Sequence, residues 1–309
     1  MKRDFLTLAD FTRAELDEIL HLAASLKRDL KAGKLPALLA GKTLAMIFEK
    51  PSLRTRVTFE VGMNQLGGHA VFLTPNDIQL GKRESVADIA RNLDRLVDLI
   101  MARTFAHETL LELARFSSVP VINGLTDLLH PCQVLSDCFT LLEQRGRLEG
   151  LRVVFIGDGN NMVNSWMNAA AHFGFDLVFA GPPGYEPDTA VRAAAQSRGA
   201  EITMTHSVFD AAQGADVIYT DTWISMGQED EADRRRESFR PYQVNPDVLA
   251  LAKDDAVVMH CLPAHRGDEI TNEVIDGPQS IVFDQAENRL HLQKAILVWL
   301  SEKSGRRVR

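Results

Sequence analysis

The chain has 309 residues, enough for two domains of ordinary size and a large buried core. Apolar residues make up 45% of it and charged residues 25%, which excludes a disordered or fibrous protein. The formal net charge is −8, and no apolar run reaches the length of a membrane span, so we expect neither a nucleic-acid partner nor a membrane partner.

The start of the chain is acidic and contains no apolar signal core, so no targeting segment is expected. The three cysteines, Cys132, Cys138 and Cys261, include no CxxC pair. This argues against a disulfide framework and against a structural zinc site. We therefore expect a cytoplasmic protein.

Strand-like and helix-like patterns alternate along the chain. Thr12 and Glu15 have the spacing of a capping box, which predicts a helix behind them. Apolar runs then predict strands at 43–48, 69–73, 98–103 and 119–123. A second series of strand candidates covers 151–159, 176–182, 201–205, 216–223, 256–263 and 280–285. A last helix, with Leu292, Ala295, Ile296 and Trp299, runs almost to the C-terminus.

Short apolar strands separated by helices are typical of parallel sheets covered on both faces. The two series predict an α/β fold with two doubly wound parallel-sheet domains, divided near 145–150. In such sheets, ligands bind beyond the C-terminal ends of the strands. The residues directly after each apolar run therefore carry most of the functional information.

The first strand candidate is followed by Ser52, Arg54, Thr55 and Arg56, where a loop enters a helix. Helix-start N–H groups, guanidinium groups and hydroxyls together suit the oxygens of a phosphate. The alternative is a solvated basic helix start with Ser52 as its N-cap.

Arg103 ends the third strand candidate, where a buried guanidinium needs either an internal carboxylate or an anionic ligand. His130 and Gln133 open a later helix. They either hydrogen-bond a substrate or serve as a capping histidine and a buried glutamine. A metal site made of His130 and Cys132 lacks a suitably spaced second ligand pair.

The run G-D-G-N-N-M at 157–162 looks superficially like a dinucleotide loop. It lacks the third glycine, and the next strand candidate is not followed by an acidic residue, which disfavours NAD. Asn160, Asn161 and Asn164 instead place amides at a helix start, where they suit a polar zwitterion.

Asp221 follows the next strand candidate, where a carboxylate can hold a cationic amine. The segment 225–240, with the triplet Arg234–Arg236, predicts an exposed loop that closes over a ligand or is simply solvated. Cys261 is either an inert apolar thiol or a residue facing the cleft. Because neighbouring strand residues point to opposite faces, a nucleophilic pair of Cys261 with His260 is not expected.

Several motifs occur in one order at the expected strand ends: S-x-R-T-R at 52–56, Arg103, H-P-C-Q at 130–133, D-x-W-x-S-M-G at 221–227 and H-C-L-P-A at 260–264. Over roughly residues 40–295 the chain resembles the aspartate/ornithine carbamoyltransferase family. The last two motifs resemble its ornithine branch.

The resemblance implies a carbamoyl-phosphate-binding domain at 1–145, to which a C-terminal helix at about 290–309 returns, and an ornithine-binding domain at 146–289. It implies a homotrimer or an assembly of trimers, in which Gln79 reaches into a neighbouring subunit's site. It implies neither a metal nor an organic cofactor.

The implied reaction transfers the carbamoyl group of carbamoyl phosphate to the δ-amine of L-ornithine, giving L-citrulline and phosphate. Arg103, His130, Asp221 and Cys261 are the implied catalytic residues. The implied contacts of carbamoyl phosphate are Ser52, Leu53, Arg54, Thr55, Arg56, Gln79, Arg103, His130, Gln133, Cys261, Leu262 and Arg289. Those of ornithine are Asn164, Asp221, Ser225 and Met226. Leu53 stands where the commonest motif has Thr, for which we expect altered phosphate affinity and retained activity.

Other functions stay open at this point. The acceptor could be putrescine, N-acetylornithine or aspartate, although Asp221 with Ser225 and Met226 favours a free amino-acid end and a side-chain amine. An NAD-dependent dehydrogenase and a binding protein without activity are the alternatives from other classes. The motifs do not separate arginine biosynthesis from arginine or ornithine catabolism, and the acceptor of the amine proton stays open among Cys261, Asp221 and the leaving phosphate.

Overall fold

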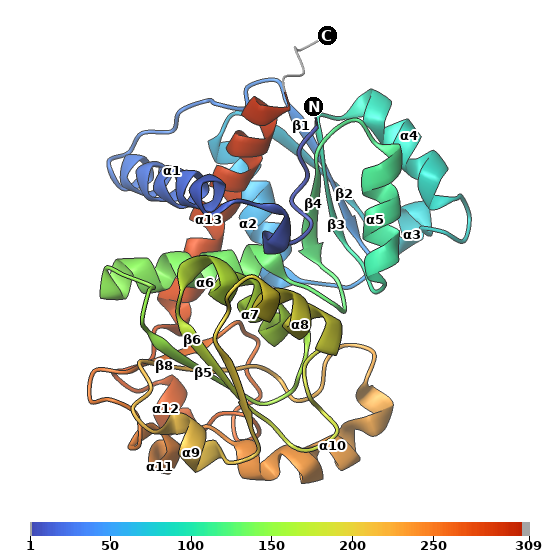
Figure 1. The fold of residues 1–309 in the computed structure, drawn as a ribbon. Helices are drawn as coiled ribbons and strands as arrows, with labels where there is room; N and C mark the ends of the chain where they lie inside the picture. The colour runs from blue at the N-terminus through green and yellow to red at the C-terminus, as the bar shows by residue number, and fades with distance from the viewer. Residues whose placement is uncertain (1, 305–309) are drawn as a thin grey trace. The chain divides into compact units, whose positions relative to one another are not determined.

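The computed structural model describes residues 2–304 and divides the chain into two compact units (Figure 1). Unit 1 comprises the residues up to Ser136 and those from Asn288 onward, and unit 2 comprises Asp137–Glu287. The division falls inside helix α6 (Pro131–Arg145), whereas the sequence places the domain boundary at the end of that helix. The change in composition near 145–150 marks where the helix ends.

Unit 1 contains a four-stranded parallel sheet in the order β2-β1-β3-β4. Its strands are β1 (Thr43–Phe48), β2 (His69–Leu73), β3 (Leu99–Arg103) and β4 (Val121–Leu125). The four predicted strands of this part of the chain are confirmed. The chain leaves β1 towards β2 and later returns to β3 on the other side of β1, so the crevice between β1 and β3 is the place where such a sheet binds ligands.

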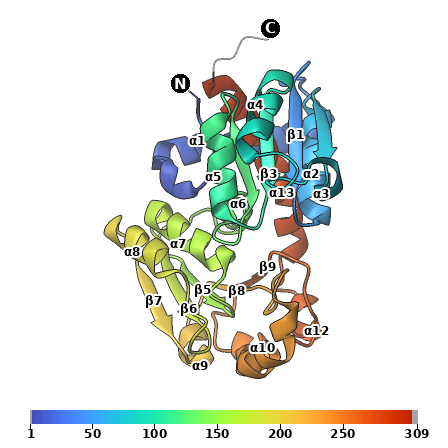
Figure 2. The same cartoon turned by 90° about the vertical axis from the view of Figure 1, so that its right-hand side faces the viewer.

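Helices cover both faces of the unit 1 sheet (Figures 1 and 2). On one face lie α4 (Val86–Leu96) and α5 (His107–Phe116), and on the other α1 (Arg13–Lys31), α2 (Leu53–Gln65) and the later part of α13 (Val282–Lys303). The short α3 (Pro75–Ile78) follows β2. The predicted capping box of Thr12 and Glu15 begins α1.

The C-terminal helix α13 packs on unit 1, as predicted. The Trp299 ring lies 5.6 Å from the Phe11 ring, and its Nε1 donates a hydrogen bond to Glu18 of α1 over 2.8 Å. Lys294 donates to Gln65 at the end of α2. The two ends of the chain therefore build one unit.

Unit 2 contains a five-stranded parallel sheet in the order β7-β6-β5-β8-β9. Its strands are β5 (Arg152–Ile156), β6 (Asp176–Ala180), β7 (Ile202–Thr205), β8 (Val217–Thr220) and β9 (Val257–His260). The fold class of two doubly wound parallel sheets is confirmed. The strand expected at 280–285 is wrong: Ser280 makes only an isolated bridge to Val258, and α13 begins at Val282.

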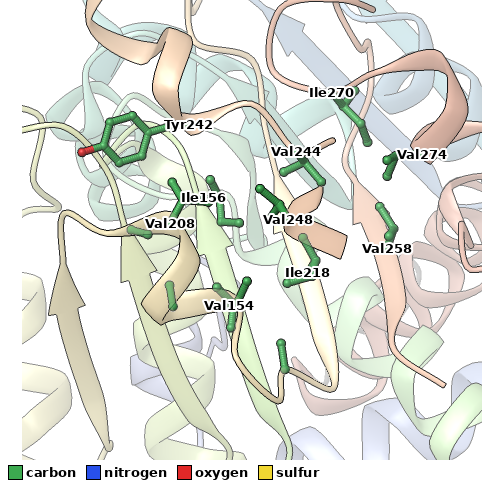
Figure 3. Packing of buried hydrophobic residues seen from close by; sticks show 14 of the residues in the cluster. Val154, Ile156, Val208, Ile218, Tyr242, Val244, Val248, Val258, Ile270 and Val274 are labelled. Carbon is green, nitrogen blue, oxygen red and sulfur yellow. The ribbon is translucent and has the colours of Figure 1, made fainter. Parts of the chain in front are cut away.

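The unit 2 sheet is also covered on both faces. One core cluster joins Val154, Ile218 and Val258 of the strands to α9 (Val208–Ala212), α11 (Pro246–Leu249) and α12 (Asn272–Ile275) (Figure 3). On the other side lie α7 (Asn161–Phe173) and α8 (Thr189–Ser197) (Figure 1). There the buried Trp166 ring of α7 meets the Tyr219 ring edge-on at 5.4 Å. Two packed faces fix the ends of β5, β8 and β9.

Candidate active site

The turn after β1 in unit 1 begins α2. The Ser52 hydroxyl accepts a hydrogen bond from the Thr55 N–H over 3.2 Å, so the capping role of Ser52 is confirmed. The first N–H groups of α2 give this end of the helix a partial positive charge, which suits an anion. Leu53, 74% exposed, contributes no hydroxyl here.

The charges of three arginines act on His130 in unit 1. Burial lowers the pKa of His130 well below its ordinary value, and the charges of Arg289, Arg103 and Arg54 lower it further. Arg289 also donates to the Thr55 hydroxyl over 2.9 Å. Four segments that are far apart in the sequence therefore meet at one place, where His130 is an uncharged imidazole in a field of positive charge.

The other residues implied for the donor differ in their surroundings. Gln133 is buried one turn after His130 in α6. Arg56 is exposed, with its Nε 3.3 Å from Glu60 and its guanidinium 3.9 Å from the centre of the Phe72 ring. Gln79 is exposed in a left-handed conformation (φ 43°) at the end of α3. The contacts of Arg56 and Gln79 thus lie outside the His130 cluster.

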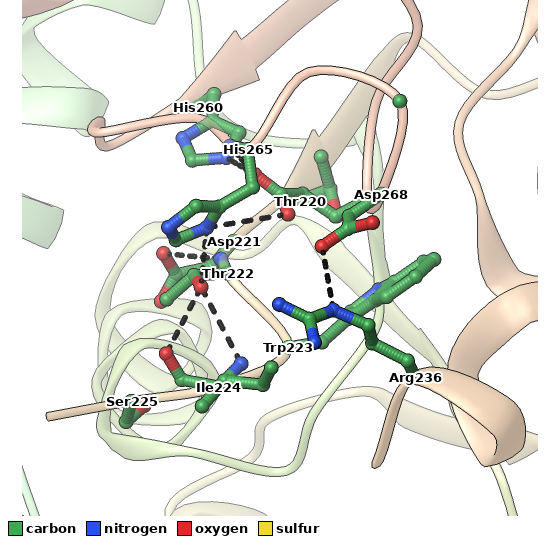
Figure 4. Close-up of polar contacts among 12 residues, drawn as sticks. Thr220, Asp221, Thr222, Trp223, Ile224, Ser225, Arg236, His260, His265 and Asp268 are labelled. Carbon is green, nitrogen blue, oxygen red and sulfur yellow. Dashed lines mark hydrogen bonds and ion pairs between the residues drawn. The ribbon is translucent and has the colours of Figure 1, made fainter. Parts of the chain in front are cut away.

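In unit 2, Asp221 lies where three neighbouring strands end (Figure 4). Its Oδ1 accepts hydrogen bonds from the Cys261 thiol over 2.9 Å and from the Thr222 N–H over 2.8 Å. Its Oδ2 accepts one from the Asn160 amide over 2.8 Å. The Cys261 thiol is therefore hydrogen-bonded, and Asp221 is held by groups from the segments that follow β5, β8 and β9.

The residues implied for the amino-acid substrate lie on α7 and on the segment after Asp221. The side-chain Oδ1 of Asn164 on α7 accepts a hydrogen bond from the Asp188 N–H over 3.0 Å. The Ser225 N–H donates to the Gln228 side chain, and Met226 is exposed. The Thr222 hydroxyl contacts the Ile224 backbone and, at 3.0 Å, His265 (Figure 4). These contacts shape the turn that carries Ser225.

His260 and Cys261 were expected to point to opposite faces of one strand. This expectation is wrong, because β9 ends at His260 and the chain turns there. The thiol and the His260 ring both lie within 4.8 Å of the Asp221 carboxylate. The Leu262 N–H donates to Nδ1 of His260, and Nε2 lies 3.0 Å from Glu269. Both ring nitrogens are thus engaged, which leaves none to take a proton from Cys261.

Asp221, His260 and Cys261 form the one group of three potential metal ligands found in residues 2–304. Carboxylate, imidazole and thiolate are suitable zinc ligands. Glu269 and the Leu262 N–H occupy both ring nitrogens of His260. Of the three side chains, this leaves Asp221 and Cys261 as possible metal ligands. Such a set falls short of the three protein ligands of a catalytic zinc ion.

The G-D-G turn of unit 2 is closed by the protein itself. The Gly159 N–H donates to the Tyr185 carbonyl over 2.9 Å. A Cβ at Gly159 would lie 2.2 Å from the carbonyl carbon of Glu186 and 2.4 Å from the nitrogen of Pro187. In a dinucleotide-binding turn the corresponding approach is made by the pyrophosphate. The space beside this glycine is occupied by the chain's own backbone.

Two candidate functional residues, Asp158 and Arg235, were not predicted from the sequence. Asp158, directly before Gly159, is buried, and burial raises the pKa of its carboxyl to about 6. The charge of Arg235 lowers this pKa, and the charge of Asp221 raises it. The expectation of an exposed loop at 225–240 is wrong in part, because the segment contains helix α10 (Ala232–Phe239), in which Arg235 is buried. The one sequence signal for this burial is a pair of aromatic residues on either side of the triplet, Trp223 and Phe239. Their rings stack with their centres 6.0 Å apart.

Two family models match the chain. The carbamoyl-P binding domain of aspartate/ornithine carbamoyltransferase matches residues 3–143, and the Asp/Orn binding domain matches residues 149–300. Ornithine carbamoyltransferase of Anoxybacillus flavithermus is 54% identical over 302 residues, 96% of each chain. That of Thermococcus kodakarensis is 54% identical over 299 residues, 96% of this chain and 95% of the relative. In the described residues, no helix is long and apolar enough to span a membrane.

Solved structures agree with these matches. Ornithine carbamoyltransferase of Pyrococcus furiosus superposes with a TM-score of 0.93 at 53% identity, over 96% of each chain. An N-acetyl-L-ornithine transcarbamylase superposes with a TM-score of 0.87 at 35% identity, over 96% of this chain and 99% of the other. With both family models matched in order and relatives aligned along nearly their whole length, this chain belongs to the aspartate/ornithine carbamoyltransferase family.

Proposed function

We infer that this protein is an ornithine carbamoyltransferase, which transfers the carbamoyl group of carbamoyl phosphate to the δ-amine of L-ornithine and releases L-citrulline and phosphate. The observation that carries this inference is the cluster of Arg54, Arg103 and Arg289 around an uncharged His130. It lies in the unit that the carbamoyl-P family model matches.

Unit 1 binds the donor in this proposal. The guanidinium groups offset the negative charge of the phosphate, and the first N–H groups of α2 add hydrogen bonds. Because the pKa of His130 lies well below its ordinary value, its ring is uncharged and donates an N–H to the carbonyl oxygen. Thr55 and Arg103 support this oxygen as negative charge develops on it during attack. The other proposed contacts in unit 1 are Ser52, Leu53, Arg56, Gln79 and Gln133. Cys261 and Leu262 are the contacts proposed from unit 2.

Unit 2 binds the acceptor. Asn164, Ser225 and Met226 contact the amino-acid end of ornithine, and Asp221 with Cys261 orients the amine. Only an uncharged amine attacks, because its lone pair forms the new C–N bond. As the tetrahedral intermediate collapses, the bond from carbon to the phosphate oxygen breaks. The amine nitrogen gives up one proton, and the leaving phosphate is basic enough to take it.

The choice of acceptor follows the relatives. The ornithine carbamoyltransferases are 54% identical to this chain, whereas the N-acetyl-L-ornithine transcarbamylase is 35% identical. A relative from Pyrococcus furiosus, 54% identical, and a structure from Campylobacter jejuni, 42% identical, are both named anabolic. They support a role in arginine biosynthesis, in the cytoplasm.

We further propose that the protein is a homotrimer. Leu53, Val57 and Val61, spaced four residues apart on α2, are exposed, as is Val71 on β2, the edge strand of its sheet. An exposed apolar stripe beside a sheet edge is a surface that a second copy can cover. Sedimentation equilibrium should give a mass of three chains of 34.3 kDa, or a multiple of it. A monomer at all concentrations would contradict this assembly.

Carbamoyl phosphate is assayed with ornithine, N-acetylornithine, putrescine and aspartate in parallel. We expect turnover with ornithine alone, and activity confined to another acceptor would overturn the assignment. Arg54→Ala should abolish turnover, whereas Arg91→Ala, which removes an exposed guanidinium from α4, is the control. Arg56→Ala should impair carbamoyl-phosphate binding less than Arg54→Ala, because Arg56 contacts Glu60 and Phe72.

A further inference from the structure

Arg235 is the buried member of a basic triplet. Helix α10 exposes Arg234 and Arg236, but the Arg235 side chain is only 5% exposed. Its guanidinium lies 4.9 Å from the centre of the Tyr185 ring and 5.3 Å from that of Phe239. A buried charge is costly unless it is paired, so the contacts of this side chain identify what it holds in place.

The guanidinium of Arg235 binds two separate segments of unit 2. One terminal nitrogen, Nη2, lies 2.5 Å from a carboxylate oxygen of Asp158, which is itself 9% exposed. The Nε donates a hydrogen bond to the Trp223 carbonyl over 2.6 Å. The planar fork of arginine can make two such bonds in fixed directions, which the single ammonium of lysine cannot. Arg235 therefore joins the turn after β5 to the segment after β8.

These two segments flank the residues that we assign to the acceptor. Asp158 is two positions before Asn160, whose amide donates to Asp221. Trp223 is two positions after Asp221 and two positions before Ser225. Figure 4 shows Asp221, Thr222, Trp223, Ile224 and Ser225 as one continuous turn. A bond that fixes the Trp223 carbonyl thus fixes the middle of this turn.

The charge of Arg235 acts on the same place. Asp221 raises the pKa of the Asp158 carboxyl, and Arg235 lowers it, so the three groups interact electrostatically. Without Arg235, the charge that lowers the pKa of Asp158 would be gone, so the Asp158 carboxyl would keep its proton to higher pH. Neither the ion pair with Asp158 nor the hydrogen bond to the Trp223 carbonyl would then join the turn after β5 to the segment after β8.

We propose that Arg235 is a positioning residue for the amino-acid acceptor: by binding Asp158 and the Trp223 carbonyl at once, it fixes Asp221 and the Ser225–Met226 turn without touching the substrate. The proposal rests on the proposed function of unit 2 as the acceptor-binding unit. It predicts an effect on the KM for ornithine and not on the KM for carbamoyl phosphate, whose proposed contacts lie mainly in unit 1.

The test compares Arg235→Gln and Arg235→Lys with Arg234→Gln, which removes an exposed charge from the same helix. Losing a charged hydrogen-bonding partner should raise the KM for ornithine about tenfold or more in Arg235→Gln. Arg235→Lys keeps the charge and loses one of the two bonds, so its KM should lie between those of Arg235→Gln and the wild type. The KM for carbamoyl phosphate should stay within about twofold in all three variants, and Arg234→Gln should match the wild type.

A second comparison tests whether Arg235 and Asp158 act as one unit. Asp158→Asn should also raise the KM for ornithine, and the double variant Asp158→Asn/Arg235→Gln should be less impaired than the product of the two single effects. If Arg235→Gln does not fold, Arg235→Lys decides. A folded Arg235→Lys with wild-type KM for ornithine would overturn the proposal, as would equal increases in both KM values. If the wild type uses another acceptor, the proposed substrate is wrong, and the same comparison is made with that acceptor.

Discussion

The Asp158 carboxyl should make unit 2 less stable as the pH rises from 4 to 6.5. Burial raises the pKa of this group from 3.8 to about 6 in the folded protein. Between these two values the folded state binds the proton and the unfolded state does not, so stability is present below pH 4 and lost as the pH passes 6. Replacing Asp158 with Asn removes this titration and nothing else that ionises.

The size of the effect follows from the shift. About two pKa units at 1.36 kcal/mol each correspond to about 3 kcal/mol of free energy of unfolding. The free energy of unfolding of the wild type minus that of Asp158→Asn should therefore fall by about this amount from pH 4 to pH 6.5. Taking the difference between the two proteins cancels the other groups that titrate in this range.

Urea denaturation at a series of pH values, followed by tryptophan fluorescence, measures this difference. Asp230→Asn removes an exposed carboxyl from the same unit and serves as the control. A difference between wild type and Asp158→Asn that stays constant or grows with pH would refute the assignment of a raised pKa to Asp158. In Arg235→Gln the loss of stability should extend to higher pH, because the charge that lowers the pKa of Asp158 is gone.

Three further predictions concern single residues. His130→Ala should lower kcat by about 100-fold or more, because the hydrogen bond that His130 donates to the developing oxyanion is lost. In the wild type, the pH profile of kcat should show no titration of His130 between pH 6 and 8, because the pKa of His130 lies well below its ordinary value. Leu53→Thr should change the KM for carbamoyl phosphate by a few-fold and leave kcat within about twofold, since a single neutral hydrogen bond is added at an exposed position; loss of activity would show that Leu53 packs against something essential. Gly159→Ala should destabilise the protein by about 1–3 kcal/mol in chemical denaturation, because the new methyl group would overlap the backbone of Glu186 and Pro187; wild-type stability would mean that this backbone moves freely.

The strands were predictable because each is a short, continuous apolar run. The runs at 43–48 and 69–73 coincide with β1 and β2. The same rule failed at 280–285, where Ile281 and Val282 are apolar because they are buried at a helix start. The segment holds only three consecutive apolar residues, and the third, Phe283, is 69% exposed. So short an apolar run does not separate a strand from the first turn of a helix.

The candidate site was predictable as far as strand ends locate it. Asp221 and Cys261 follow different strands, and their hydrogen bond comes from the neighbouring positions of β8 and β9 in the sheet. The contact of Arg289 with Thr55 joins residues at opposite ends of the chain, so no local pattern predicts it. Only the family resemblance placed Arg289 with the donor.

Buried charges were the least predictable feature. Arg235 lies between two other arginines, a pattern typical of a solvated surface, and its partner Asp158 is 77 positions away. Glu269 is fully buried beside His260, although the charged residues Arg266 and Asp268 precede it closely in the sequence. Pairing between distant segments makes such burial possible, and a local sequence pattern carries no record of it.

The discontinuous composition of unit 1 has a consequence for synthesis on the ribosome. Its sheet is encoded before residue 126, but α13, which supplies Arg289 and Trp299, is translated last. The segment of unit 2, Asp137–Glu287, lies between these two parts of unit 1 in the chain. Unit 1 therefore cannot complete its packing until the whole of unit 2 has been synthesised, and the apolar surface that α13 covers stays exposed for that time.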